Sequence, residues 1–137
     1  MNKEKKSVLF VCLENSCRSQ IAEGLLNKHA GKQIEAYSAG STPSGKINPK
    51  ALNCMNEIGY DLSSHSSKSL EEVPDIKYEW AITMGCGDYC PQIAAKHRED
   101  WKLPNPADFP ESEFASLRNL IEKRVVQLID TISKDSA

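Results

Sequence analysis

The chain has 137 residues, 39% of them hydrophobic, so we expect a single domain over 1–137 with one sizeable core. Its 17 basic and 19 acidic side chains give a formal net charge of −2, which argues against nucleic acid or an anionic membrane as a partner. No apolar run approaches the roughly 18 residues of a membrane span, and the first residues lack the apolar stretch of a signal peptide. We therefore expect a cytoplasmic protein without a membrane partner, and we expect it to be a monomer.

Apolar periodicity predicts strands that alternate with helices along most of the chain. In chain order we expect a strand over 8–11, a helix over 20–30, a strand over 34–38, a helix over 48–58, a strand over 80–84 and a helix over 111–132. This alternation is typical of an α/β fold with a parallel sheet covered on both faces. The stretch 85–110 has little periodicity of its own, so we interpret it as a long functional loop.

The first expected strand leads directly into a loop that begins at Cys12 and ends at Arg18. Ligands of parallel sheets bind beyond the carboxyl ends of the strands, and the free N–H groups where this loop enters a helix favour an anion. The same helix terminus favours the thiolate of Cys12 over its thiol. Arg18 can bind two oxygens of a tetrahedral oxyanion at once. The combination predicts a cysteine that attacks an oxyanion, rather than a core cysteine with a surface arginine nearby.

The residues around this pair would shape and support the anion site. Ser19 can hydrogen-bond to the Cys12 thiolate, and Asn15 tolerates the left-handed backbone that a tight loop needs. Glu14 places a carboxylate in an anion-binding loop, so we expect its side chain to point to solvent. The residues expected to bind substrate or support the loop are Leu13, Glu14, Asn15, Ser16, Cys17 and Ser19.

Five cysteines occur in the chain, and their odd number argues against a simple framework of structural disulfides. Cys86 and Cys90 follow the strand expected over 80–84, so they leave the sheet from the same edge as the Cys12 loop. A C-x3-C pair can form a disulfide if its loop bends, whereas two cysteines without paired histidines make a poor zinc site. We favour a redox pair over an inert pair. Cys54, on the apolar face of the helix expected over 48–58, should pack in the core.

Combining these sites gives a redox sequence for an arsenic oxyanion. Cys12 would attack the arsenic, and the Cys86 thiolate would then attack the Cys12 sulfur, releasing reduced arsenic and leaving a disulfide. Cys90 could next attack Cys86, which frees Cys12 and moves the disulfide out into a loop. A disulfide in an exposed loop would be accessible to a protein reductant.

The chain resembles the low-molecular-weight protein tyrosine phosphatase superfamily, and more closely its arsenate reductase branch. The resemblance covers 8–128 and rests on the motifs at 12–24, 37–40, 48–49, 57–63, 83–88, 90–91 and 100–101. It implies a three-layer fold with a four-stranded parallel sheet flanked by helices, and arsenate or a phosphate-like oxyanion bound in the Cys12 loop. The pair Cys86 and Cys90 favours thioredoxin as the partner over mycothiol or glutathione with a redoxin. No cofactor is implied, since reducing equivalents come from thioredoxin or another thiol system.

Several positions depart from the pattern of the superfamily. Its members usually have Asp-Pro in the late loop as a general acid, but here Asn105 precedes Pro106, and an amide cannot supply the proton. Asp108 could substitute only if the loop bends differently. Ala107 and Asp108 also stand where phosphatases tend to have paired tyrosines, which counts against phosphotyrosine. Some related reductases hold a potassium ion with a carboxylate near the position of Lys68, so we expect an internal cation here and no metal.

Two other functions remain open at this point. One is a low-molecular-weight phosphatase that acts on small phosphate esters or phosphotyrosine. The other is a non-catalytic oxyanion sensor, suggested by Asn105 and Glu14. Cys17 could pair reversibly with the nucleophile, as a cysteine at this position can in the phosphatases. We expect His65 and His97 to stabilise loops or to be exposed rather than catalytic.

Overall fold

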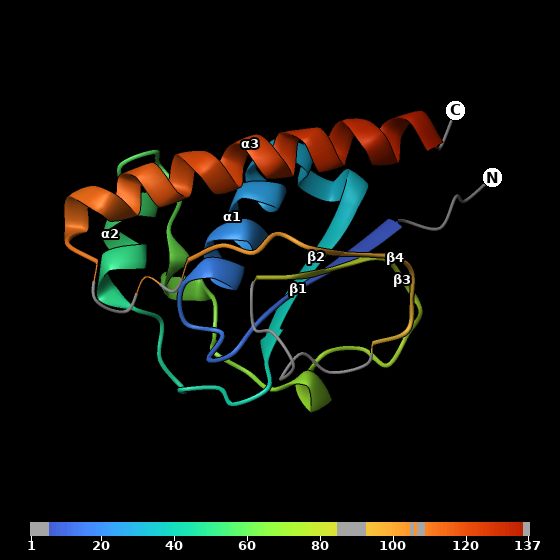
Figure 1. The fold of residues 1–137 in the computed structure, drawn as a ribbon, viewed down its shortest axis with the longest axis horizontal. Coiled ribbons are helices and arrows are strands. Elements are labelled where there is room, and N and C mark those ends of the chain that lie inside the picture. The colour runs from blue at the N-terminus through green and yellow to red at the C-terminus, as the bar shows by residue number, and fades with distance from the viewer. Residues whose placement is uncertain (1–5, 85–92, 105, 107–108, 136–137) are drawn as a thin grey trace.

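The protein was analysed as a computed structural model, and the structure describes residues 6–84, 93–104, 106 and 109–135. Within these residues, four strands and three α-helices follow one another in an alternating order that becomes β3, β4, α3 at the end (Figure 1). The elements are β1 (Lys6–Cys12), α1 (Arg18–Ala30), β2 (Ile34–Gly40), α2 (Pro49–Asn56), β3 (Tyr78–Thr83), β4 (Ala95–Asp100) and α3 (Glu111–Asp135). Three short 3-10 helices are η1 (Gly31–Gln33), η2 (Leu62–Ser64) and η3 (Leu70–Glu72). All the strands and helices expected from periodicity are confirmed.

The strands form one parallel sheet in the order β2-β1-β3-β4. This arrangement confirms the predicted four-stranded parallel sheet. The interpretation of 85–110 as an aperiodic loop was wrong for Ala95–Asp100, which is the edge strand β4. Its sequence AKHRED carries no apolar pattern, and most of its side chains are exposed. An edge strand can be held by backbone pairing to a single neighbour, so a polar sequence is tolerated there.

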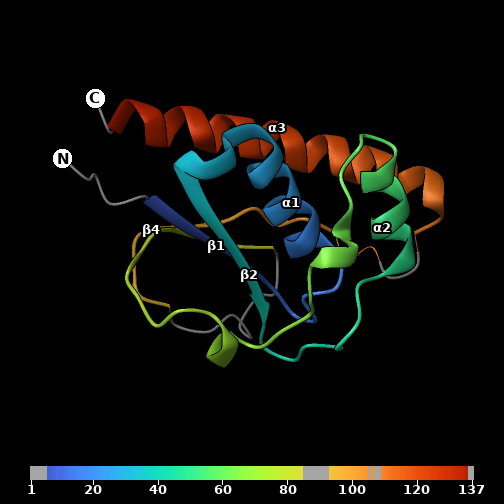
Figure 2. The ribbon, with the colours of Figure 1, turned by 180° about the vertical axis from the view of Figure 1, so that it is seen from behind.

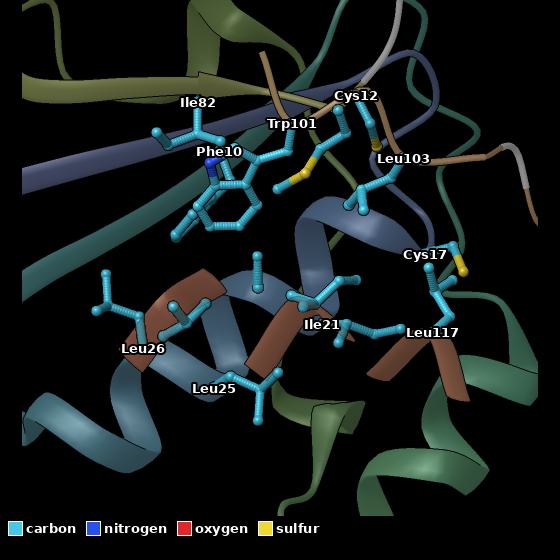
Figure 3. Packing of buried hydrophobic residues seen from close by; sticks show 14 of the residues in the cluster. Phe10, Cys12, Cys17, Ile21, Leu25, Leu26, Ile82, Trp101, Leu103 and Leu117 are labelled. Carbon is cyan, nitrogen blue, oxygen red and sulfur yellow. The ribbon is translucent and has the colours of Figure 1, made fainter. Parts of the chain in front are cut away.

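The sheet is buried on both faces, but by different kinds of structure. The three α-helices lie together on one face, where they pack on β1 residues such as Phe10 (Figures 1 and 3). Leu9 and Val11 alternate to the other face, where they pack against residues of η3 and its flanks, including Leu70 and Val73. Because consecutive residues of a strand point to opposite faces, this alternation explains the continuous apolar run of β1.

The fold brings the loop after β1 to the carboxyl edge of the sheet. β1 ends at Cys12 and α1 begins at Arg18, so loop 13–17 lies between a strand end and a helix start. Gly40, the last residue of β2, lies directly beside this loop. A Cβ atom on Gly40 would lie 2.6 Å from the carbonyl oxygen of Leu13 and 2.9 Å from the backbone nitrogen of Asn15. Only glycine therefore allows β2 to approach the loop this closely.

Among the described helices, none combines the length and the apolar character needed to cross a bilayer. The longest helix, α3, spans 25 residues but alternates buried apolar positions with charged ones. Its buried side lies over α1 and α2, with which it forms the helical layer (Figure 2).

Candidate active site

Cys12 and Arg18 lie at opposite ends of the loop and line the same small hollow. Cys12 is 3% exposed and Arg18 is 7% exposed. The hollow has a volume of about 120 Å³ and is lined by Cys12, Leu13, Glu14, Ser16, Cys17, Arg18, Asn48 and Pro106. Cys17, at the N-cap of α1, makes no side-chain hydrogen bond to the helix start. The N-terminus of α1 is therefore left open toward the loop, as an anion site requires.

Backbone N–H groups of the segment 42–48 donate hydrogen bonds to carbonyl groups of loop 13–17 and so hold the loop from outside. Because a trans peptide points its C=O and the next N–H in opposite directions, the N–H groups that follow these carbonyls point away from this segment. Such an orientation suits a loop that presents N–H groups to an oxyanion. The contacts are Thr42 N to Leu13 O (2.8 Å), Ser44 N to Glu14 O (3.1 Å) and Asn48 N to Ser16 O (2.8 Å).

Asn15 and Ser19 form the hydrogen bonds that lead to Cys12. Asn15 has a φ of 50°, the left-handed conformation expected from the sequence, and is fully buried. Its Oδ1 accepts from the backbone N–H of Lys68 at 2.9 Å, so its Nδ2 is the group that donates to Ser19 Oγ at 2.8 Å. Ser19 Oγ lies 2.9 Å from Cys12 Sγ, and either atom could donate this hydrogen bond when Cys12 is a thiol. A thiolate carries no hydrogen, so to the thiolate the Ser19 hydroxyl is the donor. A hydroxyl that donates to sulfur stabilises the thiolate relative to the thiol.

Arg18 is anchored by two backbone carbonyl groups that follow the strands β3 and β4. Its Nη1 donates to the carbonyl oxygen of Met84, just after β3, at 2.5 Å and to that of Leu103, just after β4, at 3.1 Å. Within the part of the chain that the structure describes, Nε and Nη2 have no hydrogen-bond partner. Among the described residues, the guanidinium is thus held through one nitrogen, and its other N–H groups have the geometry to bind an anion in the hollow.

The other loop side chains differ in their exposure. Glu14 is an exposed residue at the rim of the hollow, as expected if its carboxylate is in contact with solvent. Cys17 is buried near Ile21 and Leu117 (Figure 3), and burial, with a smaller effect of Cys12, strongly raises the pKa of its thiol. At neutral pH this thiol is therefore protonated and a poor nucleophile.

Cys54 belongs to the core, as predicted from its place on α2. The residue is 3% exposed, and its Sγ lies 3.4 Å from the carbonyl oxygen of Ala51. Burial raises the pKa of the Cys54 thiol to about 11. Cys54 is therefore a packing residue rather than a reactive one.

Cys86, Cys90, Asn105, Ala107 and Asp108 lie outside the described residues, so their predicted roles stay predictions. Two residues close to them in the sequence, Met84 and Pro106, lie next to the Cys12 loop or its hollow. The backbone N–H of Met84 donates to the carbonyl oxygen of Val11 at 3.0 Å, which places the chain just before Cys86 beside the end of β1. Pro106, which follows Asn105 in the sequence, is buried and lines the hollow.

Lys68 lies among polar groups close to the loop. Its Nζ donates to the carbonyl oxygen of Ser66 at 3.0 Å and lies 3.9 Å from a carboxylate oxygen of Glu23. This placement agrees with a cation built into the chain. In the described part of the chain, no cluster of three or more His, Cys, Asp or Glu side chains is arranged to hold a metal ion.

The histidines behave as predicted, whereas Gln20 was missed. His65 is largely buried and bonds to Gln20, so it stabilises the loop from behind. His97 is exposed and stacks on Trp80 with 4.7 Å between ring centroids. Gln20 is fully buried and bonds to Asn15, which sequence reasoning did not anticipate. The available signal was an amide in the first turn of the helix that follows the loop, directly after Ser19.

Comparisons with known proteins agree with this geometry. A family model described as low molecular weight phosphotyrosine protein phosphatase matches residues 7–137. An arsenate reductase of Staphylococcus aureus (strain bovine RF122 / ET3-1) is 38% identical over 122 residues, covering 86% of this chain and 92% of that protein.

Two solved structures extend the likeness to the whole fold. An arsenate reductase in the phosphate binding state gives a TM-score of 0.84 at 35% identity, over 93% of this chain and 98% of that chain. A thioredoxin-dependent arsenate reductase of Corynebacterium glutamicum gives a TM-score of 0.81 at 34% identity, over 98% of this chain and 65% of that chain. The chain with the Cys12 loop therefore belongs to the low molecular weight phosphotyrosine protein phosphatase family, within its group of arsenate reductases.

Proposed function

We propose that this protein is an arsenate reductase in which Cys12 is the nucleophile and arsenate binds in the loop that ends at Arg18. The observation that carries the proposal is the hydrogen bond of 2.9 Å between the Ser19 hydroxyl and the sulfur of Cys12, a residue that lines the same hollow as Arg18. The names of the relatives support arsenate as the oxyanion. We also propose that the protein acts as a monomer.

In the first step the Cys12 thiolate attacks arsenic and forms an S–As bond, while water or hydroxide leaves. The substrate and the thiolate are both negative, so the positive charge of Arg18 is needed to bring them together. Its free N–H groups bind two oxygens of the arsenate, and the N–H groups of loop 13–17 bind the others.

In the second step the Cys86 thiolate attacks the Cys12 sulfur. A disulfide forms between the two cysteines, the S–As bond breaks, and its electron pair stays on arsenic, which leaves as arsenite. The Cys90 thiolate then attacks Cys86, restores the Cys12 thiolate and leaves a Cys86–Cys90 disulfide. The hydrogen bond between Met84 and Val11 supports this order, because it brings the start of the segment with Cys86 to the end of β1.

Thioredoxin is the proposed reductant of the final disulfide, and the relay uses no bound cofactor or metal. The thioredoxin-dependent relative from Corynebacterium glutamicum supports this choice. A relay of free thiols functions only where they are kept reduced, so the cytoplasm is the proposed location.

The test is arsenate-dependent oxidation of NADPH in the presence of thioredoxin and thioredoxin reductase. We expect turnover in the wild type and its loss in both Cys86→Ser and Cys90→Ser. Cys54→Ala is the control, because it removes a cysteine that the relay does not use, and it should keep its activity. A wild type inactive with thioredoxin, mycothiol and glutathione systems would refute the reductase, and an active Cys86→Ser would refute the relay.

Hydrolysis of small phosphate esters is a second candidate, favoured by the family model and by the buried Pro106 at the hollow. Asn105 cannot protonate a leaving alkoxide or phenoxide, so this activity should be weak. Asn105→Asp should raise hydrolysis of p-nitrophenyl phosphate by about 10²-fold to 10⁴-fold. Wild-type hydrolysis at phosphatase rates that survives Cys86→Ser would instead favour the phosphatase.

A further inference from the structure

Every carbonyl group of loop 13–17 accepts a hydrogen bond from another part of the protein. The carbonyls of Leu13, Glu14 and Ser16 accept from the segment 42–48, as described above. Those of the other two loop residues accept from α1, with Gln20 Nε2 to Asn15 O at 3.1 Å and Ile21 N to Cys17 O at 2.9 Å. The oxygens of the loop backbone are thus directed at these donors, and the backbone offers the hollow its N–H groups instead.

The long polar side chains deeper in the hollow are donors as well. Arg18 has N–H groups on Nε and Nη2 beyond those that hold it in place. The amide of Asn48, which also lines the hollow, has a fixed orientation, because its Oδ1 accepts from the backbone N–H of Lys50 at 2.9 Å. Its Nδ2 is therefore the end that remains to donate. Unprotonated oxygens of a bound oxyanion find hydrogens from all of these groups.

The carboxylate of Glu14 is different, because it can only accept a hydrogen bond. Glu14 is exposed at the rim of the hollow, and its carboxylate makes no hydrogen bond or ion pair within the described residues. The left-handed turn of the loop falls on Asn15, so a side chain at position 14 needs no strained backbone. Apart from the nucleophile, Glu14 is thus the only described side chain lining the hollow that accepts hydrogen bonds without also being able to donate them; the Ser16 hydroxyl can do either.

Tetrahedral oxyanions differ in whether they carry a hydrogen that such an acceptor can use. At neutral and mildly alkaline pH, arsenate and phosphate keep an O–H group, whereas sulfate has none. An O–H directed at Glu14 can donate to its carboxylate while the other oxygens accept from Arg18 and the loop. A sulfate oxygen in the same place would meet a negative carboxylate with no hydrogen between them, and the two would repel each other.

We propose that Glu14 is a specificity-determining residue, which makes the hollow select oxyanions that carry a hydrogen over those that carry none, such as sulfate. The proposal rests on the proposed function, since it takes the hollow as the arsenate site. Selection of this kind works by penalising the wrong ligand, because sulfate leaves the acceptor unmet and adds a contact between like charges. Solvent at the rim screens part of the penalty, so the selectivity is expected to be smaller than in a closed site.

The test compares the binding of inorganic phosphate and sulfate by the reduced wild-type protein at about pH 8. Both anions are then mainly dianions, so they differ in the hydrogen and not in the charge. At constant ionic strength, each dissociation constant is obtained from the protection of Cys12 against iodoacetamide, with the label located by mass spectrometry. Neither anion is reduced by thiols, so the result does not depend on turnover. We expect sulfate to bind about 10²-fold more weakly than phosphate.

Glu14→Gln is the decisive variant, because it keeps the length of the side chain while adding a donor. Its amide can accept from the O–H of phosphate or donate to an oxygen of sulfate. The preference for phosphate should therefore fall to less than about fivefold, mainly because sulfate binds more tightly. The same two titrations measure this change.

Glu71→Gln is the matched control, since it removes one negative charge from an exposed residue of η3 that lines a different pocket. It should keep the wild-type preference. Equal binding of the two anions by the wild type, or an unchanged preference in Glu14→Gln, would overturn the role of Glu14 and leave the arsenate reductase proposal standing. Protection of Cys12 by neither anion would instead refute the oxyanion hollow on which both proposals rest.

Discussion

Arg18 donates a hydrogen bond of 2.5 Å to the backbone carbonyl of Met84, although 66 positions separate the two residues in the sequence. The same nitrogen bonds to Leu103 after β4. The side chain proposed to bind arsenate therefore also ties together the ends of β3 and β4. This double role allows a prediction that separates the charge of Arg18 from its shape.

Arg18→Lys keeps the positive charge but loses the fork of N–H groups. A lysine cannot hold the two carbonyls and two oxygens of an anion at once. We expect kcat/KM for arsenate to fall by about 10²-fold to 10³-fold, the usual cost of losing one stabiliser of transition-state charge. Steady-state kinetics with the thioredoxin system measures the loss.

Arg118→Lys provides the matched control for this substitution. Arg118 is also buried and donates to a carbonyl oxygen, that of Cys54, at 2.6 Å, and to Glu57 at 2.9 Å. It is not among the residues that line the hollow. The control should lower the thermal unfolding midpoint while kcat/KM stays near the wild-type value. Equal activity losses in both variants would show that Arg18 acts only through stability.

Gly40→Ala should disturb the Cys12 loop, because the new methyl group would clash with backbone atoms of the loop that cannot move aside as a side chain could. The new Cβ would lie 2.6 Å from Leu13 O and 2.9 Å from Asn15 N. We expect a loss of about 1–3 kcal/mol in the free energy of unfolding, together with lower activity. Urea denaturation and turnover measure the two effects.

Gly24→Ala is the comparison for this prediction. A Cβ at Gly24 would meet mainly the far ends of flexible side chains, Met55 and Tyr60 at 3.0 Å. Alanine also favours a helix over glycine by roughly 0.5–1 kcal/mol, which offsets part of the crowding. The loss of stability should therefore be clearly smaller than for Gly40→Ala. The reverse order would contradict the close approach of β2 to the loop.

Cys54 should make the stability of the protein depend on pH in the alkaline range. Burial raises the pKa of its thiol from 9.0 to about 11 in the folded protein. The unfolded chain therefore loses this proton at a lower pH than the folded chain, and stability falls as the pH rises from 9 toward 11. In Cys54→Ala the thermal unfolding midpoint should fall less steeply over this range. Parallel curves for the two proteins would refute the predicted shift.

The charges beside His65 should shift its pKa in opposite directions. The cation of Lys68 lowers this pKa and the carboxylate of Glu23 raises it. Lys68→Gln should therefore raise the pKa of His65, and Glu23→Gln should lower it. A pH titration of the His65 ring protons by NMR gives both values. Shifts of the same sign in the two variants would contradict the arrangement of these groups.

Part of the fold and of the site could be predicted from the sequence, because the relevant information is local. The apolar run of β1, the strand-forming residues of β2 and β3 and the periodicity of the helices predict their own conformations. The spacing from Cys12 to Arg18 predicts an anion loop, and the chemistry of Asn15 allows its φ of 50°. The polar sequence of β4 is the exception, because only pairing with β3 makes it a strand.

The sequence by itself determined which groups can react, and only the tertiary structure decided how they are held. The thiol of Cys12, the fork of Arg18 and the hydroxyl of Ser19 are properties of residue types. The side chains of Asn15 and Gln20 behind the loop are held by groups that arrive from distant segments, the N–H of Lys68 and the ring of His65, 45 positions from Gln20. Such contacts are fixed by how the segments pack, and no local pattern of residues encodes them.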